Sequence, residues 1–199
     1  MKMSMRPLVE TPARVPNADL IFVLAGLEAR KAFGLRLHNR QLAPRILLSV
    51  GRFEIRKLPR LSLPAPINLL EIAATIPPVL RHYFVWFEGG EALAERIPVG
   101  RFGTWMEIES LARWLQERKD IHTVLVVSSA HHLARIRICC RALLAPRVNV
   151  LLVPLPQEVA PEESRSRKEM LAEWLKIPVY CVLSGINRMK GGARGRPLA

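Results

Sequence analysis

The chain has 199 residues, and half of them are hydrophobic, which is enough to bury the core of one compact domain. Its formal net charge is +13, from 30 Lys and Arg residues against 17 Asp and Glu residues, a balance that suits nucleic acid, acidic lipid headgroups or a phosphorylated ligand. No apolar run approaches the ~20 residues that span a bilayer, and Met1–Ala18 contains no apolar segment of the kind that a secretory signal has.

The distribution of Arg and Cys narrows these classes. The Arg residues are spread along the whole chain without the interleaved aromatic residues of an RNA-binding sheet. A small anionic molecule is therefore favoured over nucleic acid as the partner, and a generally cationic surface explains the charge equally well. The cysteines are odd in number and have no CxxC spacing: Cys139, Cys140 and Cys181. This usage is typical of reduced, buried thiols in a cytoplasmic protein, and it favours neither a disulfide nor a metal site.

Composition divides the chain into an arm, one domain and a tail. Residues 1–18, with Pro7, Pro12 and Pro16 and no apolar periodicity, are expected to form an extended N-terminal arm. Residues 19–186 carry the strand and helix patterns of one α/β domain. Residues 187–199 are rich in Gly, Arg and Lys, and we expect a disordered basic tail there.

Apolar and β-branched runs predict the strands of this domain, which are Asp19–Gly26, Arg45–Ser49, Tyr83–Phe87, Val124–Val127 and Val148–Val153. Helical periodicity predicts the helices, which are Glu28–Leu42, Ile67–Ile76, Thr104–Lys119, the segment after Ser129, and Glu162–Lys176. We expect a turn at Glu88-Gly89-Gly90 and an irregular loop over Glu91–Phe102. The basic connection Arg52–Pro66 has no clear pattern.

The first two predicted strands both run into a glycine, Gly26 and Gly51. Repeated strand–Gly–helix units favour a parallel sheet with right-handed crossovers. The sequence therefore predicts an α/β fold, as a three-layer α/β/α Rossmann-like sandwich with a mostly parallel sheet. Gly26 and Gly51 would also let the backbone approach a ligand closely.

The segment Val124–Leu144 predicts where such a ligand would bind. Its strand runs through Ser128-Ser129 into a helix, which leaves backbone N–H groups, hydroxyls and the positive helix end at the carboxyl edge of the sheet. His132 and Arg135 are three residues apart and share one helix face. Arg135 suits a phosphate or carboxylate, or a salt bridge to a neighbouring helix. His131 and His132 are ligand-binding or catalytic candidates, with a structural role as the alternative.

Thr104 and Glu107 have two interpretations. Their spacing is that of a capping box, in which each side chain satisfies a backbone N–H at a helix start. Alternatively they bind the ligand, with Glu107 as a general base. Ser128 and Ser129 suit hydrogen bonding better than nucleophilic attack, since the chain has no G-x-S-x-G motif. G-x-G-x-x-G and P-loop motifs are also missing, which counts against ordinary dinucleotide or ATP binding.

The order of these motifs resembles the YdcF-like family, which includes the SanA and ElyC envelope proteins. The strongest match is Val127-Ser128-Ser129-Ala130-His131-His132-Leu133-Ala134-Arg135, where His132 and Arg135 fall on the family His and Arg, and His131 stands where an aromatic residue is usual. Further matches are Thr104 with Glu107, Asp19, Gly26 and Arg30. In Ser49-Val50-Gly51 one glycine of the family's Ser-Gly-Gly turn is missing, and Glu54 is the candidate for its acidic residue.

The resemblance implies a Rossmann-like domain of poorly defined biochemistry, and it makes S-adenosylmethionine a candidate cofactor. Our first hypothesis is a small-molecule site for an adenosyl-like or phosphorylated ligand, linked to cell-envelope metabolism. Its wall would comprise Gly26, Arg30, Ser49, Gly51, Thr104, Ser128, Ser129, His131 and Arg135, with His132 and Glu107 as acid–base groups for transfer or hydrolysis. The alternative is a non-enzymatic basic module acting at the envelope or on nucleic acid, whose binding would weaken steeply with salt.

Overall fold

The structure is a computed structural model that describes residues 17–100 and 102–156, together with Pro178 and Val182. The predicted N-terminal arm, the predicted helix Glu162–Lys176, Cys181 and the basic tail lie outside the described residues. Within them, no helix is both long and apolar enough to cross a membrane.

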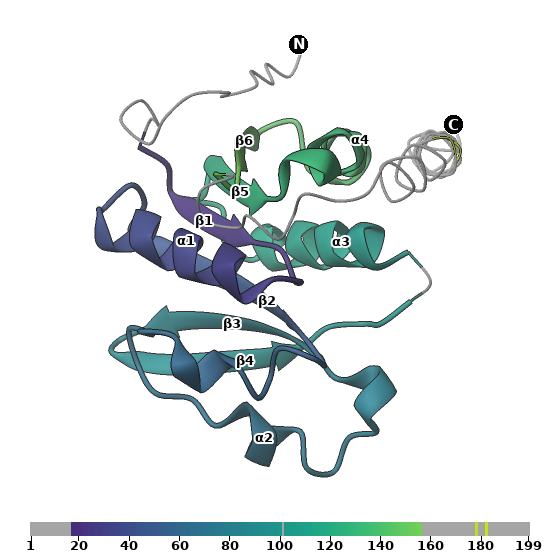
Figure 1. Cartoon of the computed structure of the whole chain (residues 1–199). Coiled ribbons are helices and arrows are strands. Elements are labelled where there is room, and N and C mark those ends of the chain that lie inside the picture. The colour runs from purple at the N-terminus through teal and green to yellow at the C-terminus, as the bar shows by residue number, and fades with distance from the viewer. Residues whose placement is uncertain (1–16, 101, 157–177, 179–181, 183–199) are drawn as a thin grey trace, which may run out of the picture.

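A six-stranded sheet with the strand order β4-β3-β2-β1-β5-β6 organises the fold (Figure 1). The strands are β1 (Leu20–Val23), β2 (Arg45–Gly51), β3 (His82–Glu88), β4 (Glu91–Arg96), β5 (Thr123–Ser128) and β6 (Asn149–Pro154). The pairs β1–β2, β1–β5 and β5–β6 are parallel, whereas β2–β3 and β3–β4 are antiparallel. The sheet is therefore mixed but mostly parallel, as the sequence predicts.

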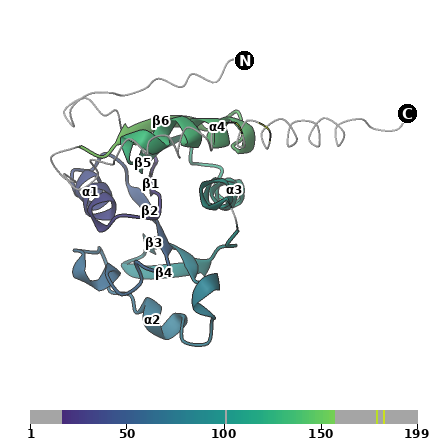
Figure 2. The ribbon, with the colours of Figure 1, turned by 45° about the vertical axis from the view of Figure 1, so that its right-hand side comes forward.

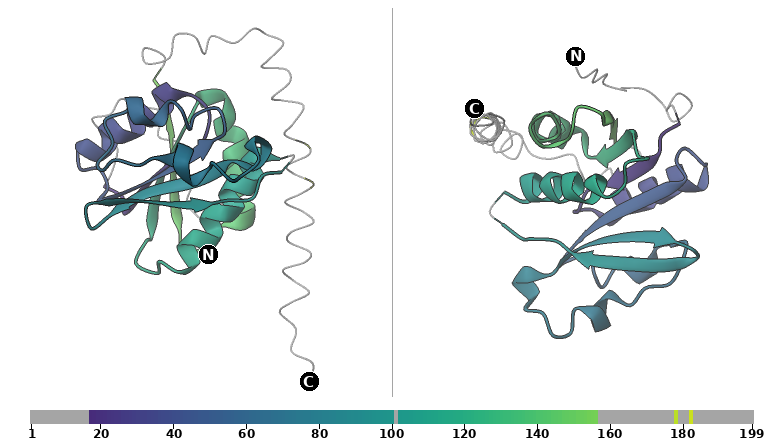
Figure 3. Two further views of the ribbon diagram at one scale, coloured as in Figure 1. Left: turned by 90° about the horizontal axis from the view of Figure 1, so that it is seen from below. Right: turned by 180° about the vertical axis from the view of Figure 1, so that it is seen from behind.

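Helices cover both faces of this sheet, which gives the predicted three layers. The helices are α1 (Glu28–Asn39), α2 (Leu69–Ile72), α3 (Gly103–Gln116) and α4 (Leu133–Leu143). Figure 2 shows α1 on one side of the strands and α3 on the other. The rear view in Figure 3 shows α3 and α4 together in front of the strands.

The sheet has a hydrophobic core on each face, because successive side chains of a strand point to opposite faces. In β1, Ile21 and Val23 pack toward α1, whereas Leu20 and Phe22 pack toward α3 and α4. All four side chains of β1 are fully buried, because a central parallel strand is covered on both faces. Asp19, just before β1, accepts hydrogen bonds of 2.8 Å from the backbone N–H groups of His122 and Thr123, so it ties the start of β1 to β5.

Two of the sequence predictions are wrong in the region between β2 and α3. Residues Glu91–Phe102 do not form an irregular loop throughout, since Glu91–Arg96 is the edge strand β4, joined to β3 by the predicted Gly89-Gly90 turn. The sequence of β4, EALAER, hides it, because it has no β-branched or aromatic residue and an exposed edge strand buries few apolar side chains. The predicted helix Ile67–Ile76 is reduced to the single turn α2, ahead of Pro77 and Pro78.

Candidate functional site

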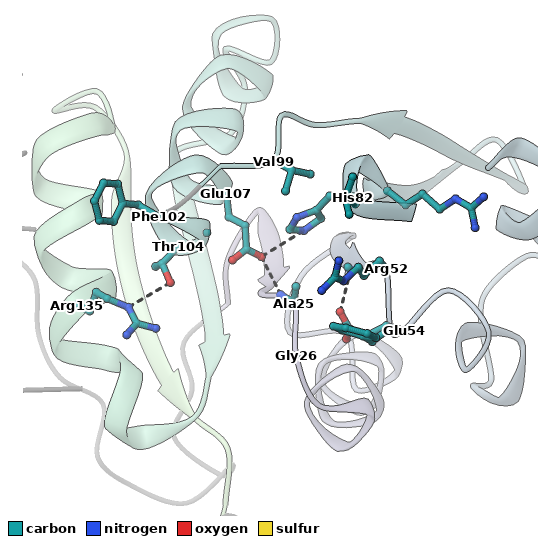
Figure 4. Close-up of a pocket in the computed structure, with 15 residues that line it drawn as sticks. Ala25, Gly26, Arg52, Glu54, His82, Val99, Phe102, Thr104, Glu107 and Arg135 are labelled. Carbon is teal, nitrogen blue, oxygen red and sulfur yellow. Dashed lines mark hydrogen bonds and ion pairs between the residues drawn. The ribbon is translucent and has the colours of Figure 1, made fainter. Parts of the chain in front are cut away.

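A cavity of about 710 Å³ opens at the carboxyl edge of β1 and β2 (Figure 4). Parallel strands end at this edge, and the antiparallel strand β3 begins there. The N-terminal turn of α3 and one residue of α4 close the other side. The described lining residues are Ala25, Gly26, Gly51, Arg52, Phe53, Glu54, Val79, Arg81, His82, Val99, Phe102, Gly103, Thr104, Glu107 and Arg135.

Glu107 lies between Thr104 and His82 in the wall of this cavity, and it links α3 to the ends of two strands (Figure 4). Its Oε1 accepts hydrogen bonds from the backbone N–H of Ala25 at 2.8 Å and from the Ser49 hydroxyl at 2.6 Å. Among the described residues, none donates a hydrogen bond to Oε2. Glu107 is 5 % exposed and lines the cavity, and its Oε1 has a structural role in joining α3 to the strand ends.

His82, the first residue of β3, extends this network. Its Nε2 lies 2.8 Å from Ser49 Oγ and 3.7 Å from Glu107 Oε1. Because the single Ser49 hydroxyl proton is donated to Glu107, His82 Nε2 carries a proton and donates to Ser49. Burial lowers the pKa of His82 below its ordinary value of 6.5, although the neighbouring Glu107 and Glu54 carboxylates oppose that shift. The ring is therefore neutral at pH 7.

Arg135 reaches the cavity from α4 and contacts α3 on the way. Its Nε donates to Thr104 Oγ1 at 3.2 Å, and its Nη2 lies 3.1 Å from His132 Nδ1. Arg135 is 9 % exposed and lines the cavity beside Thr104 (Figure 4). His132 contacts Arg135 but does not line the cavity itself. His131 contacts His132 in turn, with their Nε2 atoms 3.1 Å apart.

The capping-box interpretation of Thr104 and Glu107 is wrong. Helix α3 begins at Gly103 with Phe102 as its N-cap, and Phe102 makes no side-chain cap hydrogen bond. Thr104 is therefore already the second helical residue, from which its hydroxyl cannot cap the helix start. Thr104 Oγ1 instead accepts a hydrogen bond from Arg135, and Glu107 accepts one from the Ala25 backbone N–H.

A buried ion pair supports the floor of the cavity. Glu54 bonds the Lys31 ammonium of α1 through Oε1 and accepts the Gly51 N–H at 2.9 Å through Oε2. Burial lowers the pKa of Lys31, whereas its pairing with Glu54 raises it. The acidic residue suggested by the family resemblance therefore lies on the cavity wall, where Lys31 balances its charge.

The turn after β1 is fixed by Arg30. Its Nη1 donates to the Ala25 carbonyl at 2.5 Å and its Nη2 to Ser129 Oγ at 2.6 Å. Gly26 has a φ of +131°, and a Cβ there would come within 3.0 Å of Arg30 Nη1. Only glycine suits this position, since the backbone is strained for other residues and the space is taken by Arg30.

The structure therefore divides the predicted site residues into two groups. Gly26, Gly51, Thr104, Glu107 and Arg135 lie on the cavity wall. The others lie beneath or behind it, in the part of the chain that the structure describes: Arg30, Ser49, Ser128, Ser129, His131 and His132. The three serines are completely buried and do not line the cavity.

Sequence reasoning missed His82 and Arg52 as wall residues. His82 could have been found only if β3 had been recognised as antiparallel, which brings the start of that strand to the carboxyl edge. Arg52 lies in the connection without a clear pattern. In the described residues, no group of three His, Cys, Asp or Glu side chains is placed to hold a metal ion.

Comparisons of the chain with family models, with curated proteins and with solved structures find no match. The resemblance to the YdcF-like family therefore rests on the motif residues alone. What the site can do has to be argued from its geometry.

Proposed function

We propose that this protein binds a small ligand, either an anionic phosphorylated one or an adenosyl-like one, in the cavity at the carboxyl edge of its sheet. The observation that carries this proposal is that Arg135 and Glu107 face the same cavity from one side (Figure 4). A guanidinium recognises phosphate or carboxylate, and a carboxylate oxygen accepts hydrogen bonds from hydroxyls or an ammonium group. A ligand with both kinds of group, such as a nucleotide or S-adenosylmethionine, matches this pair.

Size and position support the same ligand class. A cavity of about 710 Å³ falls within the range of about 300–1,000 Å³ found for small-molecule sites. Open α/β sheets bind ligands at the carboxyl ends of their strands. Arg52 adds a second cation to the wall, opposite Arg135 (Figure 4).

For transfer or hydrolysis at this site, we assign the acid–base position to Glu107. Its side chain lines the cavity, and Oε1 is held by Ala25 and Ser49, whereas Oε2 accepts no hydrogen bond from the described residues. His132 has instead a positioning role, since it contacts the Arg135 guanidinium.

Calorimetric titration of the full-length protein with S-adenosylmethionine and, separately, adenosine monophosphate tests the binding site. We expect saturable binding of at least one of them. Arg135→Gln should weaken it by about 10- to 100-fold, because a hydrogen bond to a charged group is worth about 1.5–3 kcal/mol. Glu107→Gln should weaken the binding of adenosine monophosphate but leave the affinity for inorganic phosphate unchanged. Arg141→Gln is the matched control, since Arg141 is an exposed residue of the same helix.

Three outcomes would contradict the proposal. Neither ligand producing heat would exclude both of them, and equal affinities of the wild type and Arg135→Gln would remove the ligand from this cavity. Binding that weakens steeply as salt rises would indicate a surface with many phosphate contacts, which is the alternative of a basic binding module.

A further inference from the structure

The connection after β2 has two chemically distinct faces. From Gly51 to Leu61 the chain makes successive turns, with hydrogen bonds from Glu54 N to Gly51 O and from Leu58 N to Glu54 O. This spacing turns Glu54, Ile55 and Leu58 inward, where they are buried. The outward face comprises Arg52, Phe53, Arg56, Lys57 and Arg60, all of them exposed.

Phe53 is one of several exposed apolar side chains around the mouth of the cavity. Phe53 is 76 % exposed, Val79 59 % and Val99 44 %, and all three line the cavity. They come from three separate segments, which follow β2, precede β3 and follow β4. Single exposed apolar residues are common on protein surfaces, but their gathering around one opening indicates a contact surface.

The segment that brings Arg52 and Phe53 to this mouth is cationic. Residues 52–60 contain three arginines and one lysine, and their one acidic residue, Glu54, is buried and paired with Lys31. The solvent therefore meets apolar side chains flanked by cations, with no carboxylate from this segment between them. Exposed apolar groups next to Arg and Lys are the combination that binds the interface of an anionic bilayer.

We propose that this rim, defined as Phe53, Val79 and Val99 with the cations of residues 52–60, docks on an anionic lipid surface. The apolar side chains enter the boundary between headgroups and acyl chains, and the cations meet the lipid phosphates. Nucleic acid is the poorer fit, because Val79 and Val99 have no flat face on which a base could stack. In this orientation the mouth of the cavity faces the membrane.

Co-sedimentation of the full-length protein with vesicles tests this proposal. One set contains phosphatidylglycerol mixed with phosphatidylcholine, and the other phosphatidylcholine alone. We expect binding to the anionic vesicles that is at least tenfold tighter than to the neutral ones, and that weakens with salt. The double variant Phe53→Ser, Val79→Ser should bind the anionic vesicles about tenfold or more weakly than the wild type does. The double variant Lys57→Gln, Arg60→Gln should lose about fivefold for each charge.

Matched variants outside the rim provide the controls. Leu93→Ser removes a partly exposed apolar residue from the middle of β4, and Arg141→Gln removes an exposed charge from α4; both should bind as the wild type does. Thermal melting of every variant checks that it is folded. No sedimentation with anionic vesicles, equal binding by the Phe53→Ser, Val79→Ser variant, or displacement by RNA at low concentration would overturn the proposal. Arg135→Gln should keep vesicle binding, so this test is independent of the ligand site.

Discussion

At the scale of single residues, Glu107 combines two tasks that usually fall to separate side chains. Its Oε1 satisfies the Ala25 N–H and the Ser49 hydroxyl, groups that would otherwise be buried without a partner at a cost of about 1–3 kcal/mol each. Its side chain also lines the cavity, and its Oε2 accepts no hydrogen bond from the described residues. A substitution that removes the oxygens therefore changes stability as well as binding, which is why the isosteric Glu107→Gln is the informative variant.

The lowered pKa of His82 predicts a pH dependence of stability. Burial keeps the folded ring neutral to a lower pH than the unfolded one, whose pKa is near 6.5. Below that pH the unfolded chain binds more protons than the folded chain, so the free energy of unfolding falls as the pH decreases. Urea unfolding at about pH 7 and about pH 5.5 should show that the free energy of unfolding decreases more for the wild type than for His82→Gln when the pH is lowered. A difference between the two proteins that does not change with pH would contradict this.

The sequence predicts several residues of the site, but it does not predict which residues they contact. Thr104 and Glu107 are predicted as either a capping box or ligand-binding residues. The choice depends on where α3 begins, since a capping box needs Thr104 as the N-cap, whereas the N-cap is Phe102, two residues earlier. Helix boundaries are uncertain by one or two residues even in a known structure. Likewise, the spacing of His132 and Arg135 predicted that they share a face, but only the packing of α4 on α3 shows which of them reaches the cavity.

At the scale of elements, the antiparallel pair β3–β4 shapes one side of the site. The β2–β3 pairing brings His82 beside Gly51, and the return through β4 leads the chain to Val99 and the start of α3. Apolar periodicity identified β3 as a strand, but periodicity carries no information on direction. The connection from Arg52 to Arg81 is long enough for either direction, so the sequence could not decide this.

The packing of α1 on β1 predicts a sensitive position at Gly34. A Cβ there would overlap Val23 Cγ2, and Val23 is a stiff, fully buried residue of β1. We expect Gly34→Ala to lower the free energy of unfolding by about 1–3 kcal/mol, in spite of the gain in helix propensity of about 1 kcal/mol. Urea unfolding measures the difference.

Gly103→Ala is the control for this prediction. Nothing lies within 4 Å of a Cβ at Gly103, so Ala should leave stability unchanged or raise it by up to about 1 kcal/mol. If Gly34→Ala were as stable as Gly103→Ala, the contact between α1 and β1 would be looser than the structure shows.

At the scale of the whole molecule, the strand order places β1 at the centre and lets segments from both halves of the chain meet at its end. The sequence predicted this architecture from the strand–Gly–helix units and the buried apolar strands, since patterns of burial decide the layers. It could not predict that the cavity lies over β1, β2 and the start of β3, because that position depends on the antiparallel strands.

The same strand order predicts how local stability is distributed. The residues of β1 are fully buried and the strand is paired with a neighbour on both sides, whereas β4 is an edge strand with mostly exposed side chains. Hydrogen exchange followed by mass spectrometry should therefore show β1 exchanging roughly 100-fold or more slowly than β4, since protection follows burial and pairing. Equal rates in the two strands would mean that the sheet opens as a single unit.

The hydrogen bonds that hold the cavity together join residues far apart along the chain: Ala25 with Glu107, 82 positions away, and Arg30 with Ser129, 99 positions away. During synthesis at about 5–20 residues per second, the wall at Gly26 precedes the wall at Arg135 by roughly 5–20 seconds. A nascent chain that has not yet extended past α4 has no complete cavity. The proposed ligand would therefore bind only finished molecules, and it would not serve as a template on which the first strands assemble.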